Sequence, residues 1–214
     1  MRDNSFVVLT GLPASGKSTL ARGLAAHLDL PVLDKDVILE SLYDSLGVGD
    51  QTWRHRLSRA ADDILFALAA DARQAVLVNW WHRDSAPGRL HQLDAHLVEV
   101  FCDCPTTLVA ERFRTRKRHP GHLDRDLSPE QLHERLAAWA SRPGPLGLSG
   151  PLRTIDTSRP VDAAALARDI RTLLPTSTPR IRTRKQIPPS SLTSAEPRGA
   201  PTEVFGSSSG SDGS

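Results

Sequence analysis

A short apolar segment that runs directly into a glycine-rich loop constrains this chain more than any other feature. Phe6–Thr10 reads FVVLT, which is typical of a buried strand, and GLPASGKST follows at once over Gly11–Thr19. The next segment carries Leu20, Leu24 and Leu28 at helical spacing. The sequence therefore predicts a strand, a tight loop and a helix in immediate succession.

The loop meets the pattern G-x-x-x-x-G-K-[ST]. Its glycines let the backbone approach an anion closely, and its amide N–H groups, together with the positive helix end, favour a phosphate. In such a loop the lysine, here Lys17, reaches the β- and γ-phosphates, and the hydroxyl of Ser18 ligates Mg²⁺. We predict that the whole loop binds a nucleotide phosphate through Gly11, Leu12, Pro13, Ala14, Ser15, Gly16, Lys17, Ser18 and Thr19.

Strand-like and helix-like segments alternate along the rest of the chain, which predicts an α/β fold with a parallel sheet covered by helices on both faces. Ser128, with Gln131 three residues later, predicts a capping box at one helix start. Cys102 and Cys104 share one face of a strand, where we expect buried free thiols. The further strand-like runs are 30–36, 75–79, 96–103 and 152–156, and the further helix-like runs are 37–47, 56–72, 105–117, 128–140 and 161–174.

The composition changes at Pro175, where Pro, Ser, Thr and Gly replace any apolar periodicity. We therefore predict one folded domain over 1–174 and a disordered tail over 175–214, in which RIRTRK is a solvated charge run or a contact for an acidic partner. Residues 1–174 carry 22 basic and 22 acidic side chains, so we do not expect nucleic acid as a partner. Because no apolar run is long enough for a membrane span and no signal peptide precedes Phe6, we expect a cytoplasmic protein.

Two aspartates, Asp34 and Asp36, end the second strand-like run. The carboxyl ends of parallel strands face the ligand crevice of such sheets, and a carboxylate there can accept a hydroxyl proton or hold Mg²⁺ through water. We assign the functional role first to Asp36, with Asp34 as the weaker candidate. The alternative for Asp36 is a helix N-cap.

Five basic residues crowd into seven positions of the segment AERFRTRKRHPGHLD. The run leaves a helix, which would place Arg112 and Arg116 on one face, and enters a loop broken by Pro120 and Gly121. It is typical of a lid that closes over phosphates and neutralises charge, although a solvated helix end is the alternative. The histidines of HPGH do not have the spacing of a metal site. The basic residues are Arg112, Arg114, Arg116, Lys117 and Arg118.

Two further segments follow predicted strands. In NWWHRD, Trp80 and Trp81 either wall a substrate pocket or pack against the sheet, while His82 and Arg83 are candidates for binding polar substrate groups. In DTSRP, residues 156–160 either line an adenine pocket or form a plain turn.

Taken together, these segments resemble the bacterial P-loop small-molecule kinases of the AAA-domain type, whose relatives include chloramphenicol phosphotransferase, gluconate kinase and the zeta toxins. The resemblance spans roughly residues 5–174. It implies a three-layer, nucleoside-monophosphate-kinase-like fold with strand order 2-3-1-4-5 and an arginine-bearing lid. It also implies ATP, Mg²⁺ and transfer of the γ-phosphoryl group to a hydroxyl of a small metabolite, sugar or antibiotic. Within it, Asp36 matches the general base, Lys17 the loop lysine, Ser18 the metal ligand, and Arg112, Arg116 and Arg118 the lid arginines.

One position departs from this pattern. Many P-loop proteins carry an acid at the end of the third strand to hold Mg²⁺ through water, whereas this chain has Val78 and Asn79. Two alternatives therefore stand beside the small-molecule kinase. One is a kinase for a nucleic-acid end or a nucleotide sugar, and the other is a nucleotide-binding regulatory module with little turnover.

Overall fold

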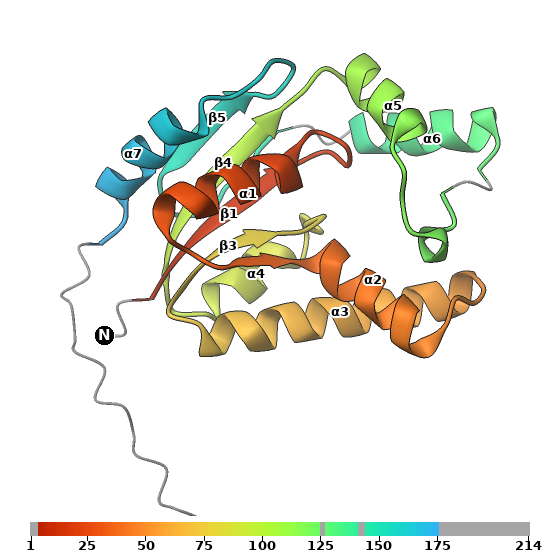
Figure 1. Ribbon diagram of the computed structural model, residues 1–214, viewed down its shortest axis with the longest axis horizontal. Helices are drawn as coiled ribbons and strands as arrows, with labels where there is room; N and C mark the ends of the chain where they lie inside the picture. Colours follow the sequence, from red (N-terminus) through yellow and green to blue (C-terminus); the bar gives the residue numbers. More distant parts are fainter. Residues whose placement is uncertain (1–3, 125–126, 141–143, 176–214) are drawn as a thin grey trace, which may run out of the picture. The chain divides into compact units, whose positions relative to one another are not determined.

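The structure, a computed structural model, describes residues 4–124, 127–140 and 144–175. The predictions for the tail after residue 175, RIRTRK included, lie outside the described residues. Five parallel strands form one sheet in the order β2-β3-β1-β4-β5, as predicted (Figure 1). The strands are β1 Ser5–Gly11, β2 Val32–Asp34, β3 Gln74–Val78, β4 His96–Asp103 and β5 Leu152–Asp156.

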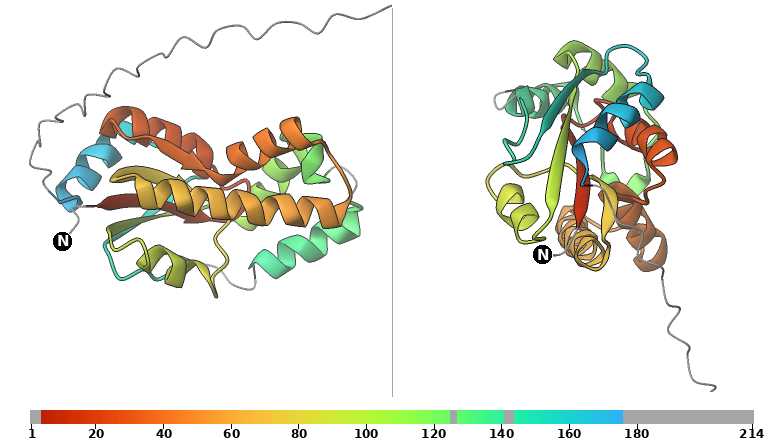
Figure 2. Two further views of the ribbon diagram at one scale, coloured as in Figure 1. Left: turned by 90° about the horizontal axis from the view of Figure 1, so that it is seen from below. Right: turned by 90° about the vertical axis from the view of Figure 1, so that its left-hand side faces the viewer.

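Helices cover both faces of the sheet, which gives the predicted three layers (Figure 2). One face carries α1 (Lys17–Leu28) and α7 (Ala163–Leu173), and the other carries α3 (Gln51–Asp71) and α4 (Ala86–His91). α2 (Lys35–Leu46) packs along α3. Beyond the carboxyl ends of the strands lie α5 (Thr106–Thr115), the short 3₁₀ turn η1 (Pro120–His122) and α6 (Pro129–Ala140) (Figure 1).

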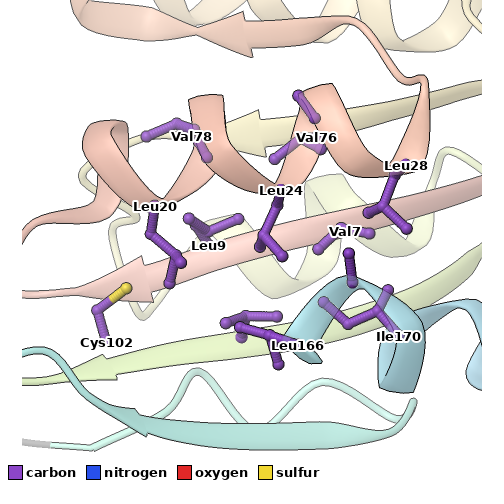
Figure 3. Close-up of a cluster of buried hydrophobic side chains, with 14 residues drawn as sticks. Val7, Leu9, Leu20, Leu24, Leu28, Val76, Val78, Cys102, Leu166 and Ile170 are labelled. Atoms are coloured by element: carbon purple, nitrogen blue, oxygen red, sulfur yellow. The ribbon is translucent and has the colours of Figure 1, made fainter. Parts of the chain in front are cut away.

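The apolar stripe of α1 packs onto the sheet. Leu20, Leu24 and Leu28 are all buried, and Figure 3 shows them directed at strand residues such as Leu9 and Val7. A second apolar cluster, built around Phe6, Val8, Leu65 and Leu90, fills the opposite face. Burial on both faces explains why the strands read as continuous apolar runs rather than alternating ones.

Local capping moves several predicted boundaries. The second strand ends at Asp34, whose carboxylate accepts a hydrogen bond from the Asp36 N–H at 3.0 Å and so starts α2. Asp36 therefore lies inside the first helical turn and is not the N-cap. Asp50 caps α3 in the same way, with 2.8 Å to the Trp53 N–H, so that helix begins before the predicted residue 56. α4 was not predicted, because Pro and Gly occupy its first turns.

Other expectations are confirmed. The Ser128 N–H donates to Gln131 Oε1 at 2.9 Å, and the Gln131 N–H donates to Ser128 Oγ at 3.2 Å, which is the predicted capping box. Cys102 and Cys104 are buried free thiols. Within the described residues, no helix has the length and apolar character needed to cross a bilayer.

Candidate active site

A cavity of about 1200 Å³ opens at the carboxyl ends of the central strands. The phosphate-loop side chains and the start of α2 form its middle. At one end, here called the α7 end, it is lined by residues 157–161 of the β5–α7 connection and by Arg112. At the other, the α3 end, it is lined by α3, by the residues after β3 and by Arg118. The sequence-predicted site residues on three separate segments thus share one cavity.

The glycine-rich loop has the backbone geometry that its sequence predicts. Gly11 has φ +129°, and a Cβ there would lie 2.6 Å from the carbonyl oxygen of Cys102, so only glycine fits. The Lys17 ammonium donates to the carbonyl oxygens of Gly11 at 3.0 Å and Leu12 at 2.7 Å. Burial lowers the pKa of Lys17 to about 8. The lysine is therefore a desolvated cation beside the loop backbone.

Asp34, the weaker of the two aspartate candidates in the sequence, lies beside the phosphate loop. Its carboxylate is buried and lies close enough to the Ser18 hydroxyl for that hydroxyl to lower the pKa of Asp34. Burial raises the pKa of Asp34, and the Ser18 hydroxyl and the hydrogen bond from the Asp36 N–H oppose that rise. A hydroxyl and a carboxylate side by side are oxygen ligands of the kind that Mg²⁺ prefers, so these two residues fit a magnesium ion beside the loop.

Asp36 faces the cavity and is held by the arginine segment. Its Oδ2 accepts a hydrogen bond from Arg118 Nη2 at 2.5 Å. Burial alone would raise the pKa of Asp36, but the charges of Arg118 and His122 outweigh it, so the pKa lies below its usual value. Arg118 also donates to Asp124 at 2.5 Å, which ties the carboxylate into a network of charges.

The other two predicted lid arginines have separate partners. Arg112 Nη1 donates to the Thr157 carbonyl at 3.0 Å and so lies at the α7 end of the cavity. Arg116 pairs with Asp124 at 3.4 Å. The predicted shared helix face of Arg112 and Arg116 is wrong, because α5 ends at Thr115 and Arg116 is an extended C-cap residue.

The HPGH segment docks on α2. The His119 ring stacks on Tyr43 with ring centroids 5.3 Å apart, and His122 Nε2 lies 2.9 Å from Glu40 Oε1. A Cβ on Gly121 would meet the Tyr43 ring at 2.5 Å, so the two segments are in close contact. Both histidines therefore hold this segment against α2, and the described residues contain no cluster of three metal-ligating side chains.

The residues after β3 divide between the core and the cavity. Trp81 is buried in the core and donates from Nε1 to the Leu9 carbonyl at 2.7 Å, so for this residue packing is the correct alternative. Trp80, His82 and Asn79 line the cavity. Arg83 does not line it, since its guanidinium donates to the carbonyls of Gly144 and Pro145.

Residues 6–143 match the AAA-domain family. The chain belongs to the P-loop small-molecule kinases of this family. Shikimate kinase from Mycobacterium tuberculosis is 33% identical over 160 residues, which cover 71% of this chain and 84% of that protein. Mouse adenylate kinase 8 is 26% identical over 147 residues, covering 61% of this chain, but the chain spans only 30% of that protein's length.

Solved structures agree with this assignment. A candidate kinase from Chloroflexus aurantiacus superimposes with a TM-score of 0.74 at 30% identity, covering 81% of this chain and 100% of that one. A gluconokinase from Sinorhizobium meliloti has a TM-score of 0.51 at 16% identity, with 81% and 93% covered, and so supports the fold alone. The resemblance to P-loop kinases and the predicted strand order are both confirmed.

One stripe of cavity residues in this P-loop kinase was not predicted from the sequence. Four polar side chains of α3 line the α3 end at spacings of three, four and seven residues, which is one face of a helix. The spacing alone could have indicated a polar face. It could not have shown that this face meets a cavity rather than bulk solvent. The four residues are Gln51, Arg54, His55 and Ser58.

Proposed function

We propose that this P-loop kinase transfers the γ-phosphoryl group of ATP to a hydroxyl group of a small molecule. The observation that supports this most is that Asp36 lines the same cavity as Lys17 and that its charge partly opposes the fall in the Lys17 pKa caused by burial. A phosphate held at Lys17 and a hydroxyl held at Asp36 would therefore lie next to each other.

The α7 end of the cavity suits the nucleotide base and sugar. Residues 157–161 and Gly23 line it, and the Arg112 guanidinium closes it over Thr157. From there the loop leads to Lys17, whose ammonium is placed to exchange its carbonyl partners for β- and γ-phosphate oxygens. We assign ATP binding to Gly11–Thr19 on this basis.

Ser18 and Asp34 would hold a magnesium ion, Ser18 directly and Asp34 directly or through water. When bound, Mg²⁺ neutralises charge that develops on the transferring phosphoryl group. Asn79, at the usual place of the acid, lines the same cavity, and Nδ2 of its side chain donates to Asp62 at 2.8 Å. Asp34 therefore offers the carboxylate that this kinase lacks after β3.

Asp36 would orient the acceptor hydroxyl and receive its proton late, as suits a loose phosphoryl-transfer transition state. Arg118 keeps this carboxylate ionised, and we propose that Arg116 and Arg118 also face the transferring group. Arg112 would act at the nucleotide side. Closure of this segment over the cavity would exclude water.

The test is ADP release and a phosphate mass gain from ATP, Mg²⁺ and a panel of hydroxylated acids, sugars, nucleosides and antibiotics. Shikimate and gluconate belong in the panel because relatives carry those names. Asp36→Asn should lower kcat by about a hundredfold or more with the best acceptor. Asp71→Asn, an exposed position at the far end of α3, is the matched control. Full activity of the Asp36 variant would disprove the base assignment.

Asn79 favours one second candidate, a nucleotide-binding regulatory module with little turnover. An amide at this place cannot supply the negative charge that an acid would. This alternative predicts tight ATP binding without phosphorylated product from any member of the panel. Product formation above the rate of ATP hydrolysis in buffer rules it out.

A further inference from the structure

Most of the basic side chains on the cavity wall donate to a neighbouring carboxylate, hydroxyl or carbonyl oxygen. Arg116, Arg118 and Arg135 surround Asp124, while Lys35 donates to Ser58 Oγ at 2.6 Å and lies 3.8 Å from Asp62. At the α7 end, Arg112 bonds a carbonyl and Arg159 pairs with Asp156. Lys17 is held by loop carbonyls and is assigned to phosphate. Each of these cations has an acceptor in the described part of the chain.

Arg54 is different. It lines the α3 end and is half-buried, yet within residues 4–124, 127–140 and 144–175 its guanidinium has no ion-pair or hydrogen-bond partner. Its Nε is fully buried without an acceptor. Leaving a partly desolvated guanidinium unpaired is costly, because it gives up hydration without gaining a counter-charge. An anion at this place would supply what the protein does not.

Arg54 lies on the same side of the cavity as the proposed base. The ammonium of Lys35, the residue next to Asp36, donates to Ser58 Oγ on α3 at 2.6 Å, and Ser58 lies one helical turn from Arg54. The stripe of Gln51, Arg54, His55 and Ser58 thus faces the region into which an acceptor hydroxyl must reach Asp36. A guanidinium binds carboxylate or phosphate oxygens through two parallel hydrogen bonds, which fixes orientation as well as position.

We propose that Arg54 binds an anionic group of the acceptor, a carboxylate or a phosphate, and thereby turns a hydroxyl of the same molecule toward Asp36. This rests on the proposed function and narrows it, since it makes the acceptor a hydroxylated acid or a phosphorylated polyol instead of a neutral alcohol. Arg54 is then a specificity-determining residue that touches substrate away from the reacting atoms.

The test is a binding measurement without turnover. The full chain is saturated with Mg²⁺ and a non-hydrolysable ATP analogue, so that the phosphate loop is filled. Calorimetry then compares two matched pairs of probes: D-gluconate with D-glucitol, and glycerol 3-phosphate with glycerol. At least one anionic probe should bind tenfold or more tightly than its neutral counterpart, and the pair with the larger preference distinguishes carboxylate from phosphate.

Arg54→Gln should remove that preference and weaken the anionic probe about tenfold, as expected for loss of one charge-assisted contact. Arg54→Lys should restore part of it. Arg59→Gln, the same change at an exposed arginine on the same helix, should leave both pairs unchanged. The melting temperature of Arg54→Gln should stay equal to that of the parent or rise, because no internal ion pair is lost, whereas a structural role for Arg54 would lower it.

Two results would overturn the proposal: no preference for either anionic probe in the parent protein, or an undiminished preference in Arg54→Gln. Because phosphoryl transfer does not occur in this assay, its outcome is separate from that of the kinase assay. If the protein prefers anions through Arg54 but never forms product, the anion-binding role of Arg54 is supported and the proposed kinase activity is not. If the protein phosphorylates a neutral alcohol equally well with Arg54→Gln, the kinase activity is supported and the role of Arg54 is not.

Discussion

Arg118 and Asp36 lie 82 positions apart in the sequence, yet Arg118 Nη2 and Asp36 Oδ2 are 2.5 Å apart. The pair joins the arginine segment to the first turn of α2. In the proposed mechanism the pair therefore joins an ionised carboxylate for the acceptor to a cation over the cavity.

This pairing predicts a pH effect. Burial raises the pKa of Asp36 and Arg118 lowers it, with the net shift downward. The proposed mechanism requires the ionised form of Asp36, so the acid limb of kcat/KM should lie below the usual carboxyl pKa of about 4 in the parent. In Arg118→Gln the effect of burial is less opposed, so the limb should rise by about 1–3 pH units. Arg114→Gln, at an exposed position of α5, should not move it. An unmoved limb in Arg118→Gln would contradict the pairing.

Lys17 predicts an effect at the alkaline side. Its pKa of about 8 in the free protein means that its charge is lost as pH rises through that value. ATP binding favours the charged form of Lys17. The Kd for ATP should therefore rise as pH increases from about 7.5 to about 9.5, because this range spans the pKa of about 8. Lys17→Arg, which stays charged over this range, should flatten the profile even if its affinity is lower. Exposed Lys117→Met is the control. Calorimetry across this range gives the answer, and a flat profile in the parent would count against a depressed pKa.

Asp34 predicts a magnesium dependence. Asp34→Asn should raise the Mg²⁺ concentration for half-maximal activity by about 10–100-fold, because a neutral amide replaces the carboxylate beside Ser18. An asparagine still accepts from the Asp36 N–H, so the start of α2 should persist. The matched control is Asp50→Asn, which makes the same change at the N-cap of α3. Equal magnesium titrations for both variants would exclude Asp34 from the metal site.

Gly121 predicts a steric effect on the docked lid. A Cβ at this position would lie 2.5 Å from the Tyr43 ring, so Gly121→Ala must push η1 away from α2. Overpacking at this contact should cost about 1–3 kcal/mol in the docking of η1 on α2, so we expect kcat/KM to fall at least about tenfold. We also expect trypsin to cleave faster after Lys117. Gly88→Ala is the control, since a Cβ there meets no atom within 4 Å. Unchanged kinetics and cleavage in Gly121→Ala would show that this contact does not matter for activity.

Glu99 predicts a large effect on stability without a catalytic role. It is buried on β4, and its oxygens accept from Thr10 Oγ1 at 2.8 Å and from the backbone N–H groups of residues 146–148 at 2.6–3.3 Å. In Glu99→Gln an amide donor must face at least one of these donors. We expect a loss of about 2–3 kcal/mol in the free energy of unfolding, measured in urea. Exposed Glu111→Gln should change it by less than about 0.5 kcal/mol.

Local patterns were enough to predict much of the fold. The loop from Gly11 to Thr19 requires glycines at particular backbone angles and a strand and helix on either side, so short-range sequence carries it. Continuous apolar runs indicated strands that are buried on both faces. α4 escaped prediction because it has six residues and a Pro-Gly pair, and its helical conformation depends on packing of Ala86 and Leu90 against the sheet.

The candidate site was predictable only where its residues belong to a motif or follow a strand end. Lys17, Ser18 and Asp36 could be chosen because motif spacing and strand ends place them at the crevice. The contact of Asp34 with Ser18, the burial of Trp81 and the position of Arg54 depend on side chains from different segments meeting in space. The sequence by itself determined a phosphate loop in a parallel α/β sheet, because backbone conformation and hydrophobic periodicity are local. Only the tertiary structure decided which cavity side chains in the described part of the chain have a partner and that Arg54 has none, because pairing and desolvation depend on contacts between residues far apart in the chain.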